Sequence, residues 1–178
     1  PFEEGASVKK GTLLLQLDKS DEQRNVAKAR TELSSSSAKY KKAVTSLLLQ
    51  KTKYNNDIKS SLSDIETALA NLKEAEDKLR RQSELFEKKI ISQESLDAAR
   101  TLFKVNKEKL IQAQTRHQKA NDSIHDITMK ENEVELVMTE VKRSEISLDE
   151  VEERLDETEI FAPINGVIIE KLVEEGQI

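Results

Sequence analysis

The long interval between Gly11 and Pro163 contains neither glycine nor proline, and this constrains the fold more than any other feature. All four glycines and both prolines of the 178 residues lie in the two end segments. A compact domain needs such turn residues roughly every dozen positions. The interval is rich in Glu, Lys, Leu, Ala, Ser and Gln instead, which favours very long helices. We therefore predict a mainly α chain.

The interval also has a repeating pattern, with seam residues at alternating steps of three and four, the period of a coiled coil. In the first arm the pattern predicts seam positions Val26, Ala29, Leu33, Ser36, Tyr40, Val44, Leu47, Lys51, Tyr54, Ile58, Leu62, Ile65, Leu69, Leu72, Glu76 and Leu79. In the second arm it predicts Leu96, Ala99, Phe103, Asn106, Leu110, Ala113, His117, Ala120, Ile124, Ile127, Glu131, Val134, Met138, Val141, Glu145, Leu148, Glu152 and Leu155. Each arm would be roughly 100 Å long as a helix.

The pattern breaks near residues 88–92, where a bend is predicted. Ser92 suits the N-cap of a new helix, and Ile91 and Leu96 hold the two positions of a hydrophobic staple around it. We expect one helix over about 19–88, entered through a capping box at Ser20–Gln23, and a second over about 92–157. Because the arms are nearly equal, an antiparallel hairpin would bring the chain's two ends together.

The two ends are predicted to be β structure. Short apolar runs alternate there with turn residues: Thr12–Leu17, Ile160–Phe161 and Val167–Ile169 are the runs, and Gly5, Gly11, Pro163 and Asn165-Gly166 are the turn signals. We expect residues 1–18 and 159–178 to be two halves of one small β domain, with a coiled-coil hairpin over 19–158 inserted between them.

Several kinds of site are not indicated. The net charge is −5 with both signs interspersed, so no basic footprint for nucleic acid is visible. There is no cysteine and no run of ~18 apolar residues, which excludes a disulfide framework and a membrane span within this sequence. No catalytic constellation, cofactor site or metal site is predicted. His117 and His125 lack the i, i+4 spacing of a helical metal pair.

We expect the chain to be an excised piece of a longer protein.

Two polar residues interrupt the predicted seam, Lys51 in the first arm and Glu131 in the second. In a hairpin that bends near residue 90 they would lie close together. A polar pair in a seam can fix helix register. A solvated ion pair explains the two residues equally well, and both interpretations stay open.

The end segments resemble the two lipoyl half-motifs of periplasmic adaptor proteins, also called membrane fusion proteins, of the HlyD-, MacA- and EmrA-like kind. The first end, from Glu4 to Asp18, is similar to EGxxVKKGxxL…LD, and the second, from Thr158 to Gln177, is similar to TxIxAPxxGxV…EGQ. Both halves, in this order around a hairpin, resemble the family over the whole chain. Lys19 follows Asp18 as in lipoate carriers, but it would open a helix rather than sit at a β tip, which argues against lipoylation.

The bend adds a third likeness. Arg81, Leu85 and Ser92 fit the Arg-x3-Leu-x6-Ser pattern of adaptors that dock onto TolC-like outer-membrane channels, and Lys89 stands near where many members carry Gly. The resemblance implies a non-enzymatic periplasmic adaptor, anchored at the inner membrane through parts not in this chain. It further implies a hexameric or trimer-of-dimers tube that joins an ABC or MFS transporter to the channel, for drug efflux or for protein or peptide export.

Two other classes remain as alternatives. A purely structural coiled-coil scaffold would use its β ends only to clamp the helices. A carrier domain of an acyl- or carboxyl-transferring enzyme is less well supported, because no modifiable lysine lies at a predicted β tip. The MacA-like and EmrA-like branches are not distinguished by these residues.

Overall fold

The computed structural model describes residues 3–173 and Gly176. Its contacts divide the chain into two units. The strand unit comprises Pro1–Lys41 with Leu136–Ile178, and the bend unit comprises Lys42–Glu135. Residues 1–2, 174–175 and 177–178, which belong to the predicted β ends, lie outside the described residues.

In the strand unit the two ends of the chain pair with each other. β1 (Ser7–Val8) is antiparallel to β4 (Gly166–Val167), and β2 (Leu13–Gln16) is antiparallel to β3 (Glu159–Phe161), with an irregularity between Leu13 and Leu15. Backbone bonds extend this pairing, among them Gly11 N to Ala162 O at 2.8 Å and Leu17 N to Thr158 O at 2.9 Å. Gly11 has φ +83°, a conformation that glycine adopts without a steric cost. The prediction that the distant ends form one β region is confirmed.

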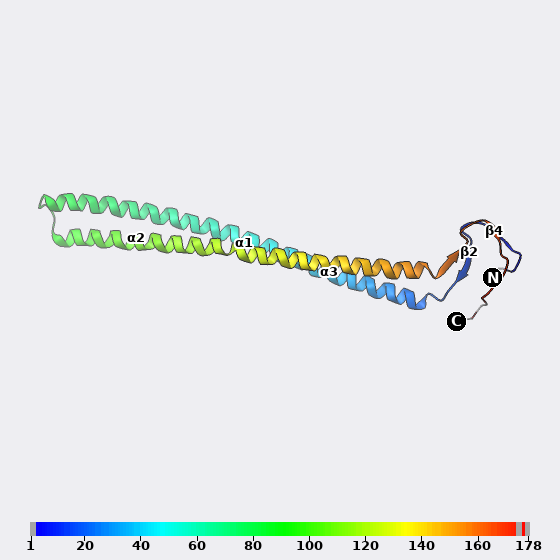
Figure 1. Cartoon of the computed structure of the whole chain (residues 1–178). Coiled ribbons are helices and arrows are strands. Elements are labelled where there is room, and N and C mark those ends of the chain that lie inside the picture. The colour runs from blue at the N-terminus through cyan, green and yellow to red at the C-terminus, as the bar shows by residue number, and fades with distance from the viewer. Residues whose placement is uncertain (1–2, 174–175, 177–178) are drawn as a thin grey trace. The chain divides into compact units, whose positions relative to one another are not determined.

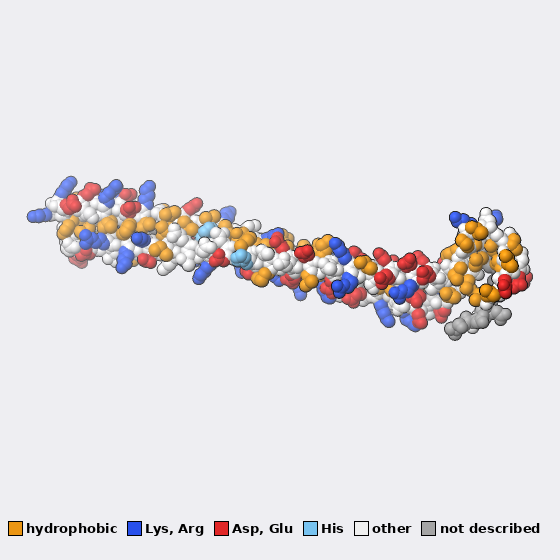
Figure 2. Space-filling view, viewed as in Figure 1, with side chains coloured by type: hydrophobic (Ala, Val, Ile, Leu, Met, Phe, Trp, Pro, Cys, Tyr) orange, Lys and Arg blue, Asp and Glu red, His pale blue; other side chains and the backbone are white. Residues whose placement is uncertain are grey.

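The strands are too short to enclose a large core. Val8 and Ala162 are buried, whereas Ile164 and Val167 remain more than half exposed. Figure 2 shows hydrophobic side chains gathered over these paired strands. The strand unit therefore depends on backbone pairing between its ends more than on a thick apolar interior.

α1 (Ser20–Glu87) begins in the strand unit, but not through the predicted capping box. The Ser20 backbone N–H and hydroxyl both donate to Asp18 Oδ1, at 2.9 and 2.7 Å, and Gln23 N donates to Lys19 O. These bonds from Ser20 lower the pKa of Asp18. A carboxylate accepts such bonds more strongly than a hydroxyl, so Asp18 caps the helix and the prediction of Ser20 as cap is wrong.

The other helix of the strand unit is the end of α3 (Ile124–Asp156), which runs antiparallel to the start of α1. Arg30 bonds Glu152 at 2.8 Å, and Lys39 bonds Glu140 at 2.8 Å. The Glu140 carboxylate raises the pKa of Lys39. These exposed pairs fix which helix positions face each other while adding little stability each.

The bend unit is an antiparallel helix pair, in which α1 passes through a short connection into α2 (Gln93–Asp122), as Figure 1 shows. Lys51 bonds Glu131 at 2.8 Å, so the two seam interruptions do meet. Ser61 Oγ lies 3.0 Å from His117 Nδ1, and Asp64 lies 3.6 Å from Arg116. The predicted hairpin, mainly α and inserted in a split β domain, is confirmed.

The seam differs from the predicted one at every second position over much of its length. Ala43, Ser61 and Ala75 are buried, while Leu62 beside Ser61 is 46% exposed. The same replacement occurs in other places: Ala68 is more buried than Leu69, and Ser144 than Glu145. Alternating large and small side chains interdigitate and let two helices approach closely. The sequence pattern selected the larger neighbour, but the helices pack on the smaller one.

The second predicted helix is interrupted at Ser123, which separates α2 from α3. Ser123 N donates to Ala120 O at 3.3 Å and Asp126 N donates to Ser123 O at 3.1 Å, both bonds of the tighter i to i+3 type. The spacing of the buried positions explains the interruption of the helix. His117, Ala120 and Ser123 follow one another at two consecutive steps of three, which overwinds a coiled-coil helix.

The first arm also changes phase. Gln50, Tyr54 and Ile58 follow at two consecutive steps of four, which underwinds the helix. The cross-helix contacts place these two stretches near each other with an offset, because Lys51 meets Glu131 and Ser61 meets His117. We call the two irregular stretches, residues 50–58 and 117–123, the phase break. No helix in the described part of the chain has the length and hydropathy to cross a membrane.

Candidate functional site

The bend begins at the end of α1, where two backbone bonds close the helix. Lys89 N donates to Phe86 O at 2.8 Å and Ile90 N donates to Leu85 O at 2.9 Å. This pair of bonds is the Schellman motif, which satisfies carbonyls that a helix end otherwise leaves unpaired. It also fixes the backbone of Leu85, one of the three predicted docking residues, because the Leu85 carbonyl accepts one of the two bonds.

Lys89 holds the left-handed position of that motif, with φ 56°. It is the one non-glycine residue with positive φ in the described part of the chain. This conformation costs a residue with a Cβ roughly 1–2 kcal/mol, whereas glycine adopts it freely. The Lys89 turn therefore carries backbone strain that a glycine would remove.

Ser92 starts α2 as predicted. Its backbone is extended, with φ −78° and ψ 159°, and its Oγ accepts from Ser95 N at 3.3 Å. Leu96 is buried and Ile91 is half-buried, in agreement with the predicted staple around this cap. Ser92 therefore caps α2, and the residue is exposed.

Arg81 and Leu85 lie one helical turn apart near the end of α1. Arg81 is exposed, and within the described residues its side chain makes no hydrogen bond or ion pair. Its neighbour Arg80 differs, because Arg80 bonds Asp77 at 3.0 Å. Leu85 is half-buried, so part of its apolar surface stays open to solvent. The structure thus brings Arg81, Leu85 and Ser92 to the same bend.

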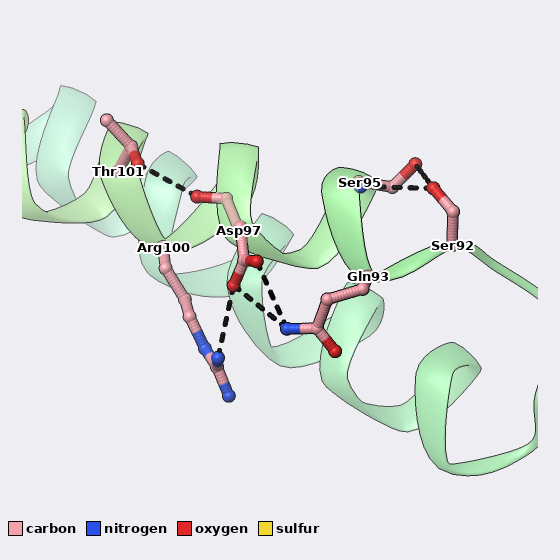
Figure 3. Close-up of polar contacts among 6 residues, drawn as sticks. All are labelled: Ser92, Gln93, Ser95, Asp97, Arg100 and Thr101. Atoms are coloured by element: carbon pink, nitrogen blue, oxygen red, sulfur yellow. Dashed lines mark hydrogen bonds and ion pairs between the residues drawn. The ribbon is translucent and has the colours of Figure 1, made fainter.

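A polar cluster on the first turns of α2 was missed by sequence reasoning. Figure 3 shows Gln93 and Arg100 directed at the Asp97 carboxylate. Gln93 Nε2 lies 3.0 and 3.1 Å from its two oxygens, and Arg100 Nη1 lies 3.2 Å from Oδ1. Thr101 Oγ1 donates to Asp97 O at 2.9 Å. The spacing of Gln93, Asp97 and Arg100, three and four residues apart, is the signal that would have found it.

The basic side chains at the bend differ in whether they form ion pairs with other described residues. The connection between the helices, residues 88–92, carries two lysines and no acidic residue. Neither lysine makes an ion pair with another described residue, and both are exposed. Arg80 and Arg100, by contrast, are bound by Asp77 and Asp97. The arrangement offers an exposed surface for binding. No group of three or more His, Asp or Glu side chains suited to a metal occurs in the described part.

One comparison with known proteins identifies the family of this chain, and others show similar solved structures. A family model described as "RND MFP, barrel-sandwich hybrid domain" matches residues 1–178. The structure of the periplasmic adaptor protein EmrA is similar, with a TM-score of 0.58 and 18% identity, over 99% of this chain and 63% of that one. MacA from Actinobacillus actinomycetemcomitans aligns with a TM-score of 0.46 and 24% identity, over 99% of this chain and 39% of that one. No curated protein sequence matches. The chain therefore spans less than two thirds of the solved adaptor structures that resemble it.

Proposed function

Because this chain belongs to the RND membrane fusion protein family through its barrel-sandwich hybrid domain, we propose that it serves as the hairpin of a periplasmic adaptor. In this role it links an inner-membrane transporter to a TolC-like outer-membrane channel and has no enzymatic activity. Residues 1–18 and 159–178 are the two halves of the lipoyl-like domain, and residues 19–158 are the hairpin. The transporter is of the ABC or MFS class, and the cargo is a drug or a secreted protein or peptide.

The bend carries the proposal. It presents an arginine with no ion pair to another described residue, a half-buried leucine and an exposed cap serine at the turn of a helix pair. Such a combination suits the end of a helical partner, since Arg81 can bond its carboxylates or carbonyls and Leu85 can enter a groove. Ser92 can cap its own helix and contact the partner at the same time. We assign the docking role to these three residues.

Family membership supports the rest of the proposed assembly. Several copies form a tube, with six as the expected number, and their β domains pack side by side. The full-length protein is held at the inner membrane by parts outside this sequence and works in the periplasm. Neither a cofactor nor nucleic acid takes part.

The test is charge reversal at the bend. Arg81→Asp is expected to weaken capture of a purified TolC-type channel by about tenfold or more, and to abolish export in cells. Leu85→Ser should act in the same direction. Both variants should keep wild-type helicity by circular dichroism and wild-type oligomer size.

The matched control is Lys59→Asp, an equal change of charge on an exposed position of α1 away from the bend. It should capture the channel and export normally. Wild-type export by a folded Arg81→Asp protein would refute the docking role. The scaffold alternative would then be preferred.

A further inference from the structure

The strained lysine in the connection between α1 and α2 is not explained by the local structure. Lys89 keeps a positive φ in a Schellman turn whose hydrogen bonds need only the backbone. Its side chain is exposed and makes no hydrogen bond or ion pair with another described residue. Strain of this kind persists at sites where a side chain has a use that the fold alone does not supply.

The Lys89 side chain could serve either the end of α1 or a binding partner. α1 has no basic residue in its last turn, so Lys88 and Lys89 lie just beyond the negative end of the helix dipole. Lys88 can meet this need from an ordinary backbone conformation, and a glycine at the next position would complete the turn without strain. The dipole therefore accounts for one lysine but not for the strained one.

The charged residues around Lys89 indicate the kind of partner surface that Lys89 contacts. The connection, residues 88–92, holds two positive charges and no negative one, while Glu84, Glu87 and Glu94 belong to the adjoining helical turns. Ile90 beside Lys89 is 64% exposed, which gives the connection an apolar contact next to its charges. A partner suited to this surface offers carboxylates beside an apolar spot.

We propose that Lys89 is a specificity-determining residue for docking, which contacts carboxylate side chains on the end of the outer-membrane channel. This inference rests on the proposed adaptor function and adds a fourth residue to its contact surface. Exposed charges at the rim of an interface act mainly on association rate, salt dependence and choice of partner. Lys89 would thus select channels with acidic ends, while Arg81 and Leu85 supply the main contacts.

The experiment compares Lys89→Gly with Lys89→Arg. Glycine removes both charge and strain, so Lys89→Gly should unfold at a higher temperature than the wild type yet bind a purified TolC-type channel about three- to fivefold more weakly in low salt. The difference should vanish as sodium chloride is raised, because salt screens exposed charges. Lys89→Arg keeps the charge and the strain, and should match the wild type in both measurements.

Arg81→Asp, measured alongside, separates the two proposals. If Arg81→Asp loses binding while Lys89→Gly binds as tightly as the wild type, only the role of Lys89 is overturned. If both bind normally, the docking function itself fails. Equal loss in Lys89→Gly and Lys89→Arg would assign the effect to side-chain shape and refute a charge contact. A lower unfolding temperature for Lys89→Gly would show that the lysine stabilises the helix end, which would also overturn the inference.

Discussion

The bend and the phase break both interrupt the helices of one unit, but by different means. At the bend the chain reverses, so two helix ends must satisfy their unpaired backbone groups. The Schellman bonds to Leu85 and Phe86 and the Ser92 cap do this. At Ser123 the chain continues in the same direction, and i to i+3 bonds carry it across. A reversal needs caps, whereas a change of winding needs none.

The same amino acid serves both places in opposite ways. Ser92 Oγ accepts from a backbone N–H at the start of a helix. Ser123 Oγ donates to the Ala120 carbonyl one turn back, at 2.6 Å. A serine therefore indicates a helix boundary only where nearby backbone groups need a capping partner. The packing of the seam determines which of the two roles each serine has.

The largest expected effect tests whether the helix at Ser123 is already relaxed. Leu62→Pro places proline in the interior of α1 and should lower the free energy of unfolding by about 3 kcal/mol or more. Ile124→Pro places it at the first residue of α3, where proline is better tolerated, and should cost less than half as much. Urea unfolding followed by circular dichroism measures both.

Leu62→Ala and Ile124→Ala are matched controls, because the two side chains are 46% and 42% exposed and lose similar contacts. They isolate the backbone effect of proline. Equal losses from the two proline variants would mean that the segment at Ser123 is ordinary helix, and the comparison with the bend would lose its basis.

A second prediction concerns the polar contact beside the phase break. Ser61 Oγ lies 2.9 Å from Ile58 O in its own helix and 3.0 Å from His117 Nδ1 across the seam. Ser61→Ala removes the partner of the His117 ring nitrogen and should cost about 1–2 kcal/mol of unfolding free energy. Urea titration at neutral pH measures it.

Ser36→Ala is the matched control for this variant. Ser36 is fully buried, and its hydroxyl donates only within its own helix, to Leu33 O at 3.0 Å. Its replacement should change stability by less than about 0.5 kcal/mol, because the hydroxyl bonds a carbonyl of the same helical turn and makes no bond to the other described helix. If Ser61→Ala and Ser36→Ala behave alike, the contact with His117 contributes nothing to the helix pairing near the phase break.

Much of the fold was predictable because its signals are local. The absence of glycine and proline predicted the long helices, and Ser92 with Ile91 and Leu96 predicted the start of α2. Pairing of the chain's ends followed from the equal arms. The closeness of Lys51 and Glu131 followed from the same argument, and the 2.8 Å ion pair confirms it.

The features that could not be predicted depend on how the two helices pack against each other. Whether Ser61 or Leu62 enters the seam is decided by how closely the arms approach, since hydrophobicity alone favours Leu62. The phase break follows from that choice and so escaped the pattern. The role of Asp18 as cap was hidden for another reason, because Ser20 offered an equally good local signal. At the bend, the sequence marked Lys89 as a departure from the glycine of many family members, but its backbone conformation became known only from its φ of 56°. The docking roles of Arg81, Leu85 and Ser92 stay a prediction.

The smallest expected effect compares the two serines directly. Ser92→Ala removes the acceptor of the Ser95 N–H and should lower the free energy of unfolding by about 1 kcal/mol, as loss of an N-cap does. Ser123→Ala removes a hydroxyl that only duplicates the bond of its own backbone N–H to Ala120 O, and should change stability by less than about 0.5 kcal/mol. Ser92→Asp, which restores a capping acceptor, should recover the loss. Equal destabilisation by both alanine variants would show that Ser123 also caps a helix end. The break at Ser123 would then belong with the bend as a true boundary, held by its side chain rather than by the winding of the seam.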